Sequence, residues 1–153
     1  MIVAAALLLA GERVALGVWQ RWAALRDSTP TRCFAIAQPL DDAGVTDRRG
    51  AFARIAVRRG PERAPAVFFR LSAPAAPGDS ITLTIGERRF ALSARDDRAF
   101  AADATTQRAI VGAIRGARWM TVTVANPGGG QRVDRYPLAG APTAIDAAQL
   151  GCR

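Results

Sequence analysis

Hydrophobic and polar residues alternate in short runs along this chain, and this pattern predicts a fold dominated by β-strands. The clearest signal lies in the stretch from Ser80 to Val124, where every second residue from Ile81 to Ile85 is aliphatic. Gly86 can adopt the positive φ that the first central position of a two-residue hairpin turn requires, and residues 88–92 then form the return strand. The stretch therefore predicts a hairpin, a short helix and a further strand.

The rest of the chain carries similar short runs, separated by turn residues. The segment 16–26 suits either one face of a helix, with Trp19 and Trp22 three residues apart, or the approach to a strand at 22–26. Further strands are expected at residues 32–38, 51–59, 66–72, 119–125 and 131–138. Seven or eight short strands predict a mainly β fold, an antiparallel β-sandwich or open barrel, as a single domain over residues 16–153.

Two short helices are expected to decorate the strands. Asp103 can N-cap a helix over residues 104–115, and Gly116 is a suitable stop signal. Pro142 can occupy the first position of a second helix that runs to about residue 150. The apolar stripe of the first helix is narrow, which indicates packing against a core and not a ligand site.

The first ten residues form an unbroken apolar run, which is about half the length that a membrane-spanning helix needs. A run of this length is typical of the core of a signal peptide, although a positively charged start and a clear cleavage site are missing. Residues 1–15 are therefore expected to be a truncated signal peptide or, as the second choice, an N-terminal helix. No transmembrane span is predicted.

The charge balance is strongly basic, with a net charge of +8 that comes from arginine alone, because the sequence contains neither lysine nor histidine. Such a balance fits an attraction to phosphates or an anionic surface, or else a composition skewed towards alanine, arginine, glycine and proline. The skewed composition is the favoured interpretation, since the arginines occur as scattered pairs and never as a run of five or more.

The missing residue types exclude several kinds of chemistry. Without histidine there can be no Ser-His-Asp or Cys-His arrangement, and without lysine no Schiff-base nucleophile. The acidic pairs Asp41-Asp42 and Asp96-Asp97 lie in predicted turns, where solvated side chains are expected and not a convergent catalytic pair. We therefore expect no enzymatic activity, no metal and no cofactor.

Arginine side chains on the predicted strands suggest an alternative function. Phe52, Arg54 and Arg58 fall on one face of their strand, with Arg70 expected nearby, and Arg88 and Arg89 follow the hairpin turn. Aromatic and arginine side chains on one sheet face are typical of proteins that bind single-stranded nucleic acid. Arg54, Arg58, Arg88 and Arg89 are accordingly the candidate anion-binding residues, with nucleic acid the less favoured partner.

Two cysteines, Cys33 and Cys152, lie far apart in the sequence. An even count with one cysteine near each end fits a single disulfide formed in an oxidising compartment. A pair of buried thiols is the other interpretation that the sequence leaves open.

Four motifs, taken in order, resemble the invasion-associated locus B family of bacterial envelope proteins. They are residues 32–39 (RCFAIAQP), the hairpin that ends at Arg89-Phe90, residues 109–120 (AIVGAIRGARWM), and residues 136–140 (YPLAG) ahead of a small-residue helix and Cys152. The resemblance implies a secreted or periplasmic β-sandwich domain that follows a signal peptide. It also implies a cysteine after the first strand and one at the C-terminus, at Cys33 and Cys152.

The resemblance implies no catalytic residues, because the family has none established. The leading hypothesis is a non-enzymatic exported or periplasmic domain that interacts with an envelope component or a protein partner, with a role in host interaction or envelope maintenance. The alternative is an arginine-dependent anion-binding or nucleic-acid-binding module.

Overall fold

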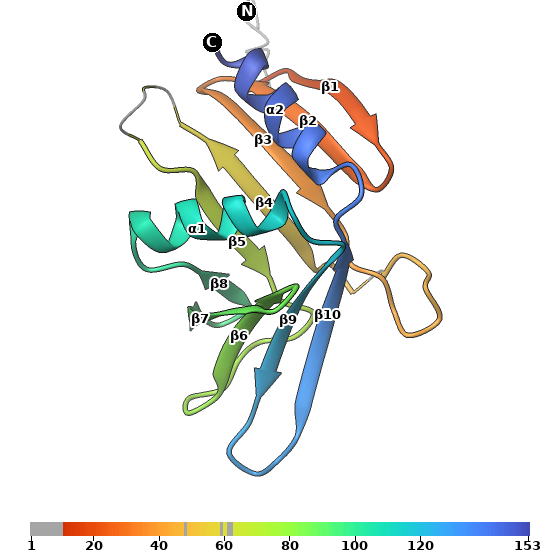
Figure 1. The fold of residues 1–153 in the computed structure, drawn as a ribbon, viewed down its shortest axis with the longest axis vertical. Coiled ribbons are helices and arrows are strands. Elements are labelled where there is room, and N and C mark those ends of the chain that lie inside the picture. Colours follow the sequence, from red (N-terminus) through yellow and green to blue (C-terminus); the bar gives the residue numbers. More distant parts are fainter. Residues whose placement is uncertain (1–10, 48, 59, 61–62) are drawn as a thin grey trace, which may run out of the picture.

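The computed structural model describes residues 11–47, 49–58, 60 and 63–153, which form one ten-stranded antiparallel sheet and two helices (Figure 1). The strands are β1 (Arg13–Trp19), β2 (Trp22–Ser28), β3 (Thr31–Ala37), β4 (Phe52–Val57), β5 (Ala66–Arg70), β6 (Ser80–Ile85), β7 (Arg88–Arg95), β8 (Arg98–Phe100), β9 (Trp119–Ala125) and β10 (Gln131–Pro137). The helices are α1 (Ala104–Ile114) and α2 (Ala141–Gly151). The predicted class, mainly β with two short helices, is confirmed, with more strands than expected.

The additional strand near the start of the described chain is β1. Residues 16–26 do not form a helix, because β1 and β2 make a hairpin in which Trp19 pairs directly with Trp22. The register of this hairpin shifts between Ala15 and Gly17, and a side chain at Gly17 would collide with the ring of Trp19. Hydrophobic and polar residues do not alternate regularly along this edge strand, so the sequence pattern did not predict it.

Strand β7 joins the two halves of the sheet. The strand order is β1-β2-β3-β4-β5-β8-β7-β6-β9-β10, and the sheet is not closed. Residues Arg88–Leu92 pair with β6, whereas Ser93–Arg95 pair with β8. One long strand therefore carries the sheet from the half that holds β1 to β5 into the half that holds β6, β9 and β10.

The core lies between the sheet and the two helices. Helix α2 packs on β1 to β4, and α1 packs against β5, β6 and β7, as Figure 1 shows. The buried face of α2 is largely alanine, which allows its backbone to approach the strands closely. The two halves of the sheet meet in the core, where Trp22 Nε1 donates to the Pro137 carbonyl at 2.8 Å and the rings of Phe69 and Tyr136 lie 6.1 Å apart.

Local signals in the sequence account for the ends of these elements. Asp103 caps α1 as predicted, since its Oδ1 accepts a hydrogen bond from Thr106 N at 2.8 Å. Gly86 adopts the positive φ of 59° that the hairpin turn between β6 and β7 requires. Helix α2 begins one residue before the predicted Pro142, after Gly140, whose φ is 89°.

Candidate functional site

A disulfide joins Cys33 in β3 to Cys152, which directly follows α2. The two Cα atoms lie 5.9 Å apart, within the range of about 4.4 to 6.8 Å that is usual for disulfides. Cys33 is completely buried, because α2 covers its strand. The bond fastens the last helix to the middle of the N-terminal strands, and the described part of the chain has no free cysteine.

The sheet face that turns away from the helices is the most distinctive surface of the molecule. On β4 the side chains of Ala53 and Ile55 are buried in the core, so Phe52 and Arg54 point to the opposite face, as predicted. This face lies behind the helices in Figure 1. Seven residues of four adjacent strands form what we call the aromatic–arginine face: Phe52, Arg54, Phe68, Arg70, Arg95, Arg98 and Phe100.

Strand register orders these side chains into two neighbouring rows. In the first row, Arg95 of β7 pairs with Arg98 of β8, Arg98 pairs with Arg70 of β5, and Arg70 pairs with Phe52 of β4. In the second row, Phe100 pairs with Phe68, and Phe68 pairs with Arg54. A line of guanidinium groups therefore runs across the strands beside a line of phenyl rings.

Between the rows lies a shallow hollow of about 420 Å³, lined by Phe52, Arg54, Phe68, Arg70, Asp97 and Arg98. The rings of Phe52 and Phe68 are 5.9 Å apart and tilted against each other. Phe100 is 40% exposed, which is unusual for a side chain of its size. The hollow thus offers open ring surface next to positive charge.

Arg54 is held in place by aromatic rings. Its Cζ lies 5.2 Å from the centroid of Phe68 and 5.7 Å from that of Phe34, so the guanidinium interacts with the faces of two rings. Its Nε is buried and has no hydrogen-bond partner among the described residues. The neighbouring Arg70 Nε contacts Asp97 Oδ2 at 3.0 Å, in an ion pair that is largely exposed and therefore weak.

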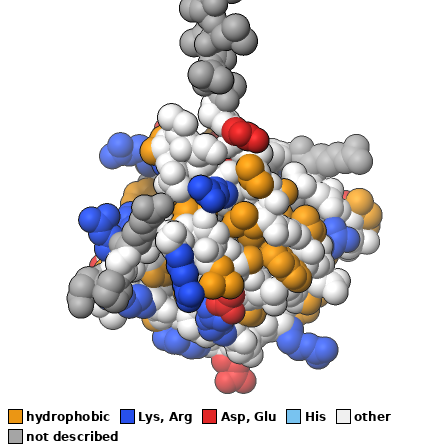
Figure 2. All heavy atoms as spheres, turned by 90° about the horizontal axis from the view of Figure 1, so that it is seen from above, with side chains coloured by type: hydrophobic (Ala, Val, Ile, Leu, Met, Phe, Trp, Pro, Cys, Tyr) orange, Lys and Arg blue, Asp and Glu red, His pale blue; other side chains and the backbone are white. Residues whose placement is uncertain are grey.

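The structure does not bring the four predicted anion-binding arginines together. Arg54 lines the hollow of the aromatic–arginine face, whereas Arg58 follows β4 and lines a separate hollow beside Cys152. Arg88 lies over the ring of Phe90, at 5.0 Å from its centroid, in a groove next to the end of α1. Arg89 pairs with Thr84 on the hairpin. In Figure 2 the arginine side chains are likewise spread over the visible face and its edges.

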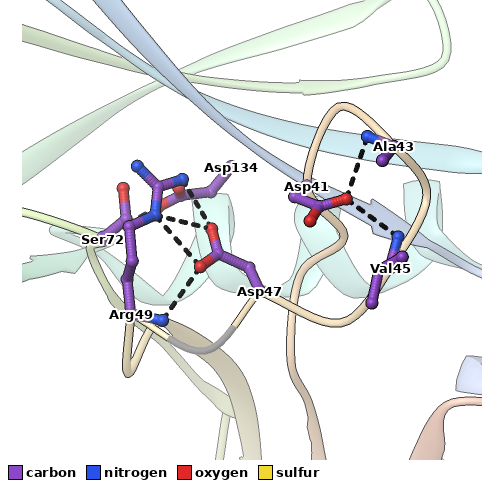
Figure 3. Close-up of polar contacts among 7 residues, drawn as sticks. All are labelled: Asp41, Ala43, Val45, Asp47, Arg49, Ser72 and Asp134. Atoms are coloured by element: carbon purple, nitrogen blue, oxygen red, sulfur yellow. Dashed lines mark hydrogen bonds and ion pairs between the residues drawn. The ribbon is translucent and has the colours of Figure 1, made fainter.

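In each acidic pair of the sequence, one aspartate has a side-chain partner within the protein. Asp41 Oδ1 accepts hydrogen bonds from the backbone N–H groups of Ala43 and Val45, both at 2.9 Å, and so shapes its own loop (Figure 3). Asp97 pairs with Arg70 as described above, and Asp96 occupies the left-handed region, with φ 54°, in the turn between β7 and β8. Both pairs lie in turns, as the sequence indicated.

A buried polar cluster was not predicted at all. Asp47 and Asp134 are 5% and 4% exposed, respectively. Asp47 binds Arg49 through side-chain and backbone hydrogen bonds, and Asp134 Oδ2 accepts from Ser72 N at 3.1 Å (Figure 3). Of the described residues, none provides a hydrogen-bond partner for the hydroxyl of Tyr136. The alternation of β10, which turns Asp134 and Tyr136 to the same inner face, was the signal that could have revealed part of this cluster.

Electrostatics in this cluster follow from burial and pairing. The hydrogen bond from Arg49 holds the pKa of Asp47 below its ordinary value. Burial raises the pKa of the Tyr136 hydroxyl far above its ordinary value, and the charges of Asp134 and Asp47 raise it further. The loop that carries Asp47 is bonded to β10 by Leu40 N, which donates to the Arg135 carbonyl at 2.8 Å, and the arrangement is that of a structural anchor.

Two kinds of feature are absent from the described residues. No cluster of three or more histidine, cysteine, aspartate or glutamate side chains could hold a metal ion there. In the same part of the chain, no helix combines the length and the apolar character needed to cross a bilayer.

The fold and the site define a class of protein: a small antiparallel β-domain with a disulfide-fastened C-terminal helix and an open sheet face. One crystal structure with this fold is that of invasion associated protein B from Bartonella henselae, with a TM-score of 0.67 and 13% sequence identity. The match covers 92% of this chain and 99% of the other. At this identity the likeness shows a common fold alone. No protein-family model matches the sequence, and no curated protein does either.

Proposed function

We propose that this chain is a non-enzymatic domain that works outside the cytoplasm, in the periplasm or after secretion, in association with the bacterial envelope. The observation that carries the proposal is the disulfide between Cys33 and Cys152. Disulfides form and persist in oxidising compartments and are rare in the cytosol. The likeness in fold to invasion associated protein B supports the same setting.

The protein's role there is binding, either of an envelope component or of a host or bacterial protein partner. Its side chains favour binding over catalysis. Aspartates that could act in catalysis are instead used in turns, ion pairs and a buried structural anchor, and the sequence has no histidine or lysine. The open face of the sheet, in contrast, presents aromatic and cationic side chains to solvent.

A fusion of the full chain to a reporter that is active only after export tests the location. The matched control is the same fusion without residues 1–10, the apolar run that is the candidate export signal. Reporter activity in the first fusion and its loss in the second are the expected results. A fusion that stays cytosolic, together with two thiols that react with an alkylating agent before any reduction, would overturn the proposal.

Arginine-dependent anion binding is the second candidate function, and the row of Arg95, Arg98 and Arg70 favours it. Binding of this kind releases counterions and falls steeply as salt rises. Retention on a polyanion column at low salt and elution by salt are expected. A protein that does not bind the column at low ionic strength would exclude this function.

A further inference from the structure

The two rows of the aromatic–arginine face have a regular spacing. Neighbouring strands lie about 4.8 Å apart, so the backbone positions of Arg95, Arg98 and Arg70 recur about every 5 Å along a line that crosses the strands. Phe100 and Phe68 stand beside this line at the same interval. A ligand that matches the face must therefore be a linear chain with repeated negative charges on one side and repeated flat groups on the other.

We propose that the aromatic–arginine face binds single-stranded nucleic acid, with phosphates along the arginine row and bases stacked on the phenylalanine row. This inference deepens the second candidate function and rests on it. Proteins that bind single strands with little sequence preference combine a positively charged track with aromatic rings on which successive bases stack. Phe100 offers the most exposed ring of this face, and Phe68, which pairs with it, continues the row towards Arg54.

The contacts of Arg54 prepare the face for such a ligand. Its guanidinium is held against Phe68 and Phe34, so this part of the surface is ordered before a ligand arrives. The ion pair between Arg70 and Asp97 is exposed, and a phosphate can therefore compete for Arg70 at little cost. An acidic polysaccharide would use the same arginines, but it has no bases to stack on the phenylalanine row.

A hollow near the end of α2 that also carries arginines is less suited to an anion. It is lined by Arg58, Arg63 and Arg153, but it lies at the C-terminal end of α2. The free carbonyl groups at that end of a helix carry partial negative charge, which the arginines there offset. Neither α1 nor α2 ends against the aromatic–arginine face, because both of these helices pack on the opposite side of the sheet.

Fluorescence anisotropy on the purified, oxidised full chain tests the proposal with two labelled probes, a 15-nucleotide oligothymidine and an abasic strand of the same length. The oligothymidine should bind roughly tenfold more tightly than the abasic strand, because only the former can stack. Phe100→Ala should weaken oligothymidine binding roughly tenfold and leave the abasic strand unaffected. The control Val133→Ala removes a similarly exposed apolar side chain on β10 and should change neither affinity.

The arginine row has its own test. Arg98→Gln should lower the slope of log affinity against log salt by about 0.7, the value for one phosphate contact on a single strand. Arg118→Gln, which removes the same charge from an exposed site outside the face, should leave the slope unchanged. Thermal melting of each variant confirms that it is folded.

The possible results distinguish nucleic-acid binding from the more general anion binding on which it rests. Equal binding of the two probes, with no effect of Phe100→Ala, would overturn the nucleic-acid proposal and leave anion binding standing. Heparin that binds as tightly as oligothymidine, through Arg98 and without Phe100, would assign the face to an acidic polysaccharide. Absence of binding to every probe at low salt would refute both.

Discussion

Removal of the disulfide should cost this protein much of its stability. The bond joins residues 119 positions apart, and a cross-link of that span lowers the conformational entropy of the unfolded chain considerably. In the chain-entropy description, a loop of this size corresponds to about 5 kcal/mol at 25 °C. For a chain of 153 residues, at about 2 to 4 °C per kcal/mol, the melting temperature should fall by about 10 to 20 °C.

The measurement is urea denaturation, followed by tryptophan fluorescence, of the wild type and the double variant Cys33→Ala/Cys152→Ala. Reduced wild type should match the double variant to within about 1 kcal/mol, and addition of a reductant to the double variant should have no effect. The folded state should remain intact in the variant, because Ala141, Ala144 and Ala148 still pack α2 on the strands. Amide exchange in α2 should therefore stay slow.

Two results would refute this reasoning. A loss below about 1 kcal/mol would show that the cross-link does not limit the unfolded chain as its length implies. Rapid amide exchange confined to α2 would show that the bond acts in the folded state instead, as a clamp without which the helix detaches.

Substitutions at Tyr136, Asp47 and Gly140 test other parts of the structure. Tyr136→Phe should alter the unfolding free energy by less than about 1 kcal/mol, because the buried hydroxyl has no partner among the described residues, whereas Tyr136→Ala should lose about 3 to 5 kcal/mol. Tyr136 is the only tyrosine and its pKa is raised, so absorbance at 295 nm should show no tyrosine ionisation in the folded protein. Because the unfolded chain ionises at the ordinary pKa, the free energy of unfolding should fall as pH rises above about 10 in the wild type but not in Tyr136→Phe. Asp47 has a lowered pKa, so it stabilises the fold above its ordinary pKa of about 4, and the stability difference between wild type and Asp47→Asn should shrink as pH falls below that value; a difference that stays constant as pH falls below about 4 would contradict this. Gly140→Ala should cost more than about 2 kcal/mol in thermal or urea unfolding, because its Cβ would lie 2.1 Å from the Trp19 carbonyl oxygen, whereas Gly44→Ala, with a similar positive φ and open space around it, should cost only about 1 kcal/mol.

Local patterns in the sequence predicted the parts of the fold that depend on neighbouring residues. Ile81, Leu83 and Ile85 are buried on one face of β6, and Asp103 caps α1, because alternation and capping act over a few residues. Strand β1 was missed, since an edge strand with a bulge lacks regular alternation. Its hairpin depends on contacts with α2, which come from the other end of the chain.

The sequence predicted only some residues of the aromatic–arginine face, because periodicity does not show which strands pair. The sequence placed Phe52 and Arg54 on one face and Arg70 near them, because alternation fixes the side of a strand on which a residue lies. Arg98 and Phe100 were not connected with these residues, since β8 has only three residues and pairs with β5 across the intervening hairpin of β6 and β7. Pairing between strands that are distant in sequence cannot be deduced from periodicity.

The position of α2 also bears on when this protein can fold. Residues 141–151 form α2, which covers β1 to β4. The side chains of Trp22, Ala24 and Ala35, which are buried in the folded protein, therefore stay open to solvent until this helix has been synthesised. A ribosome adds about 5 to 20 residues per second, and the N-terminal strands must wait several seconds for their cover. The N-terminal half of the sheet can therefore complete its core only after residues 141–151 have left the ribosome.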